Sequence, residues 1–253
     1  MAVAIALPQT IPALGWVRIV IRLLSMIALL VACIPLYYLF RLTGQRNPVP
    51  RFFLGGVAWI AGVEVKVAGT RPKRGVFLLA NHVSWIDVPA LAGVTGAAFV
   101  GHDGLASMPI LRWLCAMNDT VFVARYDRAS VAEQVAQVRA AIKDSGALAI
   151  FPEGTTSDGT GLLPFKSSLL SALDPVPPGI AVRPVLLDYG DEAAEISWIG
   201  EEHGLDNFKR ILARGRPVRL TLHFLEPLTN GALTDRKTMA AAARDAMLRE
   251  LQD

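Results

Sequence analysis

Two short apolar runs in this chain each end at a cluster of polar residues. Residues 75–80 are followed by the sequence Asn-His-Val-Ser-Trp-Ile-Asp at 81–87, and residues 147–150 by Phe-Pro-Glu-Gly-Thr-Thr at 151–156. Apolar runs of this kind predict fully buried strands. In an open α/β sheet, the functional site lies where such strands end. The pattern therefore predicts an α/β fold whose site is built from both clusters.

The first cluster places His82 at a strand end and Asp87 five positions later, in the first turn of the element that follows. A carboxylate can accept a hydrogen bond from one imidazole nitrogen and leave the other nitrogen free to take a proton. We therefore interpret His82 as a general base and Asp87 as the residue that fixes its tautomer. The simpler interpretation, that His82 only caps a helix, leaves the cluster around Glu153 unexplained.

The rest of the chain after residue 62 also has an α/β pattern. Further strands are predicted at residues 63–67, 97–101, 120–124, 180–188 and 218–225. Helices are predicted at residues 130–143, which open with a capping box, and at residues 234–251. These elements predict a single αβα domain around a mixed sheet, spanning residues 63–253.

The charged residues are unevenly distributed. The first 63 residues contain five arginines and no acidic residue, whereas the remainder contains 20 basic and 22 acidic residues. A nucleic-acid-binding protein would spread basic residues over a folded face, so no nucleic-acid partner is expected. Arginines that flank apolar stretches predict contact with anionic lipid headgroups. Residues 1–62 are therefore predicted to form a membrane-associated helical segment, with the lipid bilayer as partner.

Two apolar stretches occupy this segment, at residues 23–40 and 52–63. The first would form a helix roughly 27 Å long, against a bilayer core of about 30 Å, and Pro35 is expected to kink or end it. The second is too short to span a bilayer. The segment could be a spanning helix with an interfacial helix, or a hairpin within one leaflet. A third alternative packs both helices on the domain.

Four blocks in this chain resemble the motifs of the PlsC-like family of glycerolipid acyltransferases. Asn81, His82 and Asp87 match its Asn-His-x4-Asp motif, and residues 151–155 match Phe-Pro-Glu-Gly-Thr. Residues 121–125 and 182–185 resemble its second and fourth blocks. The resemblance implies transfer of a fatty acyl chain from acyl-CoA or acyl carrier protein to the hydroxyl of a lysolipid acceptor. It also implies a membrane-associated enzyme whose active site lies on the cytoplasmic face.

The resemblance and the chemistry of the clusters together indicate the residues that bind substrate. Gly154 is a candidate donor to the oxyanion, because a glycine amide can approach a substrate closely. Glu153 would either bind the acceptor's glycerol hydroxyl or hold its loop. The full set of predicted substrate-binding residues is Asn81, Arg125, Glu153, Gly154, Thr155, Thr156, His102 and Lys166.

Two of these positions depart from the family pattern. Thr156 stands where the third motif usually has arginine, and His102 where members tend to carry lysine. Both basic residues are assigned to the acceptor's phosphate, which requires fixed cations, so Arg125 and Lys166 would have to supply them. Residues 151–159 also resemble the version found in lyso-ornithine lipid acyltransferases, whose zwitterionic acceptor has no phosphate.

The family as a whole favours lysophosphatidic acid (1-acyl-sn-glycerol-3-phosphate) as acceptor and phosphatidic acid as product. Lyso-ornithine lipid, giving ornithine lipid, is the alternative. No cofactor and no metal site are expected, since neither His-Glu-x-x-His nor Cys-x-x-Cys occurs. A membrane esterase is disfavoured by the lack of Gly-x-Ser-x-Gly. A non-catalytic lipid-binding protein would have no use for His82 and Asp87 at this spacing.

Overall fold

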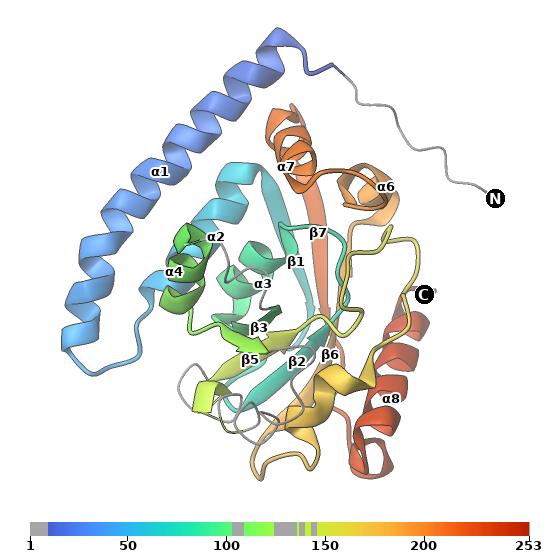
Figure 1. The fold of residues 1–253 in the computed structure, drawn as a ribbon. Helices are drawn as coiled ribbons and strands as arrows, with labels where there is room; N and C mark the ends of the chain where they lie inside the picture. Colours follow the sequence, from blue (N-terminus) through green and yellow to red (C-terminus); the bar gives the residue numbers. More distant parts are fainter. Residues whose placement is uncertain (1–9, 103–108, 124–135, 137–139, 143–145, 253) are drawn as a thin grey trace.

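The computed structural model describes residues 10–102, 109–123, 136, 140–142 and 146–252 (Figure 1). Within this part of the chain, the seven strands of one sheet lie in the order β1-β7-β6-β2-β5-β3-β4. Strands β6 and β7 are antiparallel, and the other neighbouring pairs are parallel. The mixed sheet confirms the predicted α/β fold. The strands are β1 (Val63–Gly69), β2 (Val76–Ala80), β3 (Ala98–His102), β4 (Val121–Val123), β5 (Ala147–Ile150), β6 (Ala181–Asp188) and β7 (Val218–Phe224).

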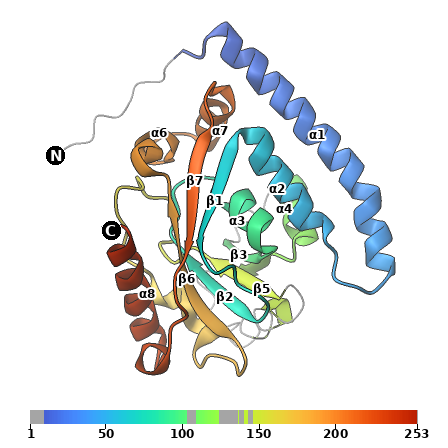
Figure 2. The ribbon, with the colours of Figure 1, turned by 180° about the vertical axis from the view of Figure 1, so that it is seen from behind.

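Helices cover both faces of this sheet (Figures 1 and 2). On β2, Leu78 and Ala80 pack into one hydrophobic core, while Phe77 and Leu79 pack into another. Helices α2, α3, α6 and α7 contribute to the first core, and α8 contributes to the second. The helices are α1 (Ala13–Leu42), α2 (Val49–Ala61), α3 (Asp87–Thr95), α4 (Pro109–Met117), α6 (Ala193–Ile196), α7 (Gly204–Ala213) and α8 (Arg236–Glu250), and the 3-10 helices are η3 (Ser167–Leu173), η4 (Gly190–Glu192) and η5 (Asn230–Leu233).

The sheet brings the two polar clusters together. Strands β2 and β5 are parallel neighbours, with Leu79 paired to Ile150. Because both strands end at the same edge, residues 81–87 and 151–156 leave the sheet side by side. The predicted C-terminal helix is confirmed as α8, whose N-cap Asp235 accepts from two main-chain N–H groups. Most of the helix predicted at residues 130–143, including its capping box, lies outside the described residues.

The N-terminal segment forms a helical hairpin of α1 and α2 (Figure 1). Helix α1 is long and apolar enough to cross a membrane, with a mean hydropathy of 2.6 over its most apolar 18 residues. Pro35 was expected to kink or end this helix; it does not end it, since the helix continues to Leu42. Ile19 of α1 and Ala61 of α2 belong to the same core as Val63 of β1. The hydrophobic core is thus continuous across the predicted boundary at residue 62.

Arginines attach this hairpin to the domain. Arg18 and Arg22 donate to main-chain carbonyls in the last turn of α7, with Arg22 2.8 Å from the oxygen of Leu212. Arg46 and Arg51 donate in the same way at the C-terminal end of α3. Unpaired carbonyls at a helix C-terminus attract cations. Four of the five arginines that predicted lipid contact therefore have an intramolecular role at helix ends.

Candidate active site

His82 and Asp87 lie in direct contact at the junction of β2 and α3. The Asp87 Oδ2 atom accepts from His82 Nδ1 at 2.7 Å, from the N–H of Val83 at 2.6 Å and from the N–H of Ser84 at 2.9 Å. Asp87 is fully buried, whereas one fifth of the His82 side chain is exposed. The turn between the two residues therefore orients the carboxylate, and the carboxylate orients the ring.

Tyr189 completes the set of donors to this carboxylate. Its hydroxyl donates to Asp87 Oδ1. The side chain is almost fully buried, and burial together with the nearby charge of Asp87 raises its pKa well above the usual value. It therefore remains a neutral donor. The sequence analysis missed Tyr189, and its position just after β6, at the same sheet edge, was the available signal.

The geometry leaves one ring nitrogen of His82, Nε2, available for chemistry. With Nδ1 bound to Asp87, the imidazole can accept a proton on Nε2, and His82 lines a cavity. The ring of Phe151 stacks on the imidazole, with centroids 4.1 Å apart and planes 16° apart. The second cluster also fixes the main chain of this residue, since both the N–H and the hydroxyl of Ser157 donate to the His82 carbonyl. The arrangement suits a general base.

The cavity beside His82 has a volume of about 1030 Å³. Most of the residues that line it are apolar, and α1, α2, α3 and α4 contribute many of these, among them Leu30, Phe53 and Leu114. Its polar end is formed by Gly154, Thr155 and Thr156. A space of this size, apolar along most of its length and polar beside a base, suits a lipid chain with a reactive group at one end.

Glu153 lies beneath this polar end, with an exposed fraction of 1%. Among the described residues, neither of its carboxyl oxygens makes a hydrogen bond of ordinary geometry. Burial raises the pKa of Glu153 to about 8, and polar groups of His82, Leu163 and Ser157 offset part of this increase. The carboxyl is therefore mainly protonated at neutral pH. Of the two roles predicted for Glu153, this position favours support of the loop.

Gly154 and Thr156 are held in the loop by hydrogen bonds. The N–H of Gly154 donates to the carbonyl of Phe151 at 3.0 Å, so an oxyanion would have to share this donor. Gly154 has a φ of +68°, and a Cβ there would lie 3.0 Å from Nζ of Lys166, which places that amine beside the turn. The hydroxyl of Thr156 donates to the carbonyl of Trp198. Thr156 therefore anchors a neighbouring loop.

The remaining predicted substrate-binding residues lie in different environments. The buried amide of Asn81 both donates to and accepts from the main chain of Leu187, so it ties β2 to β6. The main chain of His102 ends β3, and its side chain lies outside the described part. Arg125 also lies outside the described residues. No cluster of metal-ligating side chains occurs among the residues that the structure describes.

Comparison with known proteins identifies relatives of this chain. The acyltransferase family model matches residues 62–187. A lyso-ornithine lipid O-acyltransferase of Brucella abortus is 29% identical over 94% of this chain and 96% of that protein. One of Pseudomonas aeruginosa is 32% identical over 81% of this chain and 79% of that protein. A 1-acyl-sn-glycerol-3-phosphate acyltransferase of Neisseria gonorrhoeae is 35% identical over 53% of this chain and 52% of that protein.

A solved structure has the same fold. The crystal structure of PlsC, the 1-acyl-sn-glycerophosphate acyltransferase of Thermotoga maritima, superposes with a TM-score of 0.64 at 22% identity, over 94% of this chain and 96% of that one. The sequence relatives establish the family independently of this likeness. The chain belongs to the PlsC-type acyltransferase family and is an acyltransferase.

Proposed function

We propose that this protein is a lysolipid O-acyltransferase whose acceptor is lyso-ornithine lipid. The observation that carries the choice of acceptor is the environment of Thr156. This residue occupies the position where phosphate-handling members of the family carry arginine, and its hydroxyl is bound to the Trp198 carbonyl. Among the described residues that line the cavity, none is lysine or arginine. A phosphate monoester requires such cations, whereas a zwitterionic headgroup does not.

His82 would act on the acceptor hydroxyl. As that oxygen attacks the thioester carbonyl, Nε2 takes its proton, and Asp87 stabilises the imidazolium. The tetrahedral intermediate then collapses, the carbon–sulfur bond breaks, and the imidazolium returns the proton to the departing thiolate. No side chain becomes acylated. General-base catalysis of this kind contributes about 10²–10⁴-fold.

The acyl donor is proposed to be acyl-CoA or acyl carrier protein, with no metal or cofactor. The apolar part of the cavity would hold an acyl chain, and its polar end would hold the reacting groups. The outward side of α1, with exposed Val20, Leu24 and Val31, would contact the bilayer. The active site would then face the cytoplasm, where either thioester donor is made.

Lysophosphatidic acid is the second candidate acceptor. The Nζ of Lys166 lies beside Gly154, so one cation is available next to the third motif. The Neisseria gonorrhoeae relative named for this activity is 35% identical over about half of the chain. The same catalytic pair would serve both acceptors.

Purified enzyme in detergent, given equal concentrations of the two lysolipids and one thioester donor, tests the choice. We expect ornithine lipid to be the main product, with an excess of at least about tenfold, because a missing ionic contact is worth roughly 1.5–3 kcal/mol. Preferential formation of phosphatidic acid would reject the proposed acceptor. Donor cleavage without either product would reject the transferase mechanism.

A further inference from the structure

Glu202 is one of the residues that line the cavity. Among the described residues that line the cavity, Glu202 is the one carboxylic acid and His82 is the one imidazole. Glu202 lies on the loop between α6 and α7, and its side chain is 24% exposed. Charged groups at apolar surfaces are costly unless they are paired. Glu202 meets this requirement through its ion pair with Arg210.

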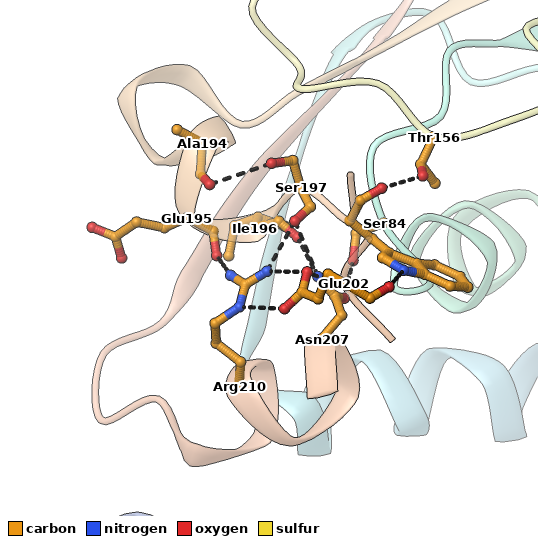
Figure 3. Close-up of polar contacts among 10 residues, drawn as sticks. Ser84, Thr156, Ala194, Glu195, Ile196, Ser197, Glu202, Asn207 and Arg210 are labelled. Atoms are coloured by element: carbon orange, nitrogen blue, oxygen red, sulfur yellow. Dashed lines mark hydrogen bonds and ion pairs between the residues drawn. The ribbon is translucent and has the colours of Figure 1, made fainter. Parts of the chain in front are cut away.

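A polar network fixes Glu202 in place (Figure 3). Arg210 of α7 donates from Nη2 to Oε2 at 2.8 Å and from Nε to Oε1 at 2.9 Å. The fully buried amide of Asn207 donates to Oε2 at 3.0 Å and accepts from the hydroxyl of Ser84 at 3.2 Å. A carboxylate has about four acceptor positions, and these bonds occupy three of them. Oε1 therefore keeps one position for a further donor.

The indole of Trp198 contacts Glu202. Its Nε1 donates to the main-chain carbonyl of Glu202 at 2.7 Å, and Trp198 and Glu202 both line the cavity. The main-chain N–H of Trp198 donates to the carbonyl of Val83 at 2.9 Å, and Thr156 donates to the Trp198 carbonyl. The loop is thus tied to the residue next to His82 and to the third motif.

A fixed carboxylate beside an indole ring is suited to an ammonium group. The carboxylate accepts a charge-assisted hydrogen bond, and the ring face attracts a cation. We propose that Glu202 and Trp198 form a subsite for the ammonium of the acceptor headgroup, which rests on the proposed function and deepens it. A phosphate dianion has no proton to donate to this acceptor position, so the subsite would select lyso-ornithine lipid over lysophosphatidic acid.

The test uses two acceptors that differ at this amine. They are lyso-ornithine lipid and the same lipid with its side-chain amine acetylated, each assayed with full-length enzyme in detergent. Acetylation should raise KM of the wild-type enzyme about tenfold or more and leave kcat within about threefold. Glu202→Gln should raise KM for the amine form by a similar factor and remove most of the discrimination. Glu195→Gln, a surface acid that pairs with Arg214 and Arg216, is the matched control and should keep the wild-type ratio.

The outcomes separate the two proposals. Wild-type enzyme that does not acylate lyso-ornithine lipid rejects the proposed acceptor and the subsite together. Wild-type enzyme that uses both forms with equal KM rejects the subsite and leaves the acceptor standing. Equal impairment of both forms by a folded Glu202→Gln variant assigns Glu202 a structural role and also overturns the subsite. Where the variant does not fold, equal KM of the wild-type enzyme for the two forms still overturns the subsite, and a raised KM for the acetylated form supports it.

Discussion

Gly93 of α3 lies against Gly55 of α2, so closely that a Cβ on Gly93 would be 2.6 Å from the Cα of Gly55. The two main chains are in contact at this point, so neither helix can move closer to the other. Helix α3 begins with Asp87, which orients His82, the proposed general base. The contact therefore connects the N-terminal hairpin to the active site through one short helix.

Gly93→Ala should destabilise the protein. The added methyl overpacks this contact at a cost of about 1–3 kcal/mol, and the better helix propensity of alanine, roughly 1 kcal/mol, offsets part of that cost. Thermal unfolding in detergent measures the effect. Gly161→Ala is the control, because a Cβ there meets no atom within 4 Å. A Gly93→Ala protein as stable as wild type would mean that the helices separate freely.

His82→Ala should nearly abolish acyl transfer while the protein stays folded. Loss of the base removes about 10²-fold or more from kcat. Product formation is followed by mass spectrometry, and folding by circular dichroism. Asp87→Asn should also be severe, because its amide can hold the imidazole in the wrong tautomer. Activity within tenfold of wild type in folded His82→Ala enzyme would end the proposed mechanism.

Tyr189→Phe should lower both stability and activity by moderate amounts. The change removes one donor from the buried Asp87 carboxylate, and a hydrogen bond to a charged group is worth roughly 1.5–3 kcal/mol. Asp87 keeps the N–H donors of Val83 and Ser84, so the pair with His82 should survive. The free energy of unfolding and the pH profile of kcat measure the two effects. Tyr38→Phe, at an exposed tyrosine of α1, serves as control, and equal behaviour of both variants would contradict this role.

Glu153 should make the stability of the protein depend on pH. Its pKa is raised to about 8 in the folded state, from an ordinary value of 4.5. The folded state therefore holds an extra proton between these values, and the stabilisation present below pH 4.5 is lost as the pH rises to 8. Within this range the free energy of unfolding falls by up to roughly 1.4 kcal/mol for each unit of rising pH. Glu153→Gln should flatten the curve in detergent, and an unchanged slope would place the ionisation elsewhere.

Exposed apolar residues of α1 should hold the protein on membranes. Replacing Val20, Leu24 and Val31 by serine removes apolar side chains that face away from the cavity, each worth roughly 1.5–3 kcal/mol on full burial. Flotation with anionic vesicles measures binding. Leu205→Ser, at an exposed leucine of α7, is the control. Full flotation of the triple variant would locate the membrane contact outside α1.

The sequence determined much of this protein by itself. The seven strands of the described sheet lie where the sequence predicted them, because central strands such as β2 and β5 are uninterrupted apolar runs, whereas β1 and β7 alternate apolar and polar residues. The contact between His82 and Asp87 was also predictable, since five residues suffice for a turn that brings a carboxylate back to a ring.

Long-range packing decided the rest. Tyr189 is 102 positions from Asp87, and Asn207 is 123 positions from Ser84, so neither contact leaves a local pattern. Arg22 was interpreted from its apolar neighbours as a lipid contact, and the fold also gives it the Leu212 carbonyl at the end of α7. The roles proposed for Thr156 and Glu202 likewise depend on the loop and the cavity beside them. Such roles depend on which surfaces the fold brings together, and a single sequence does not contain that information in local form.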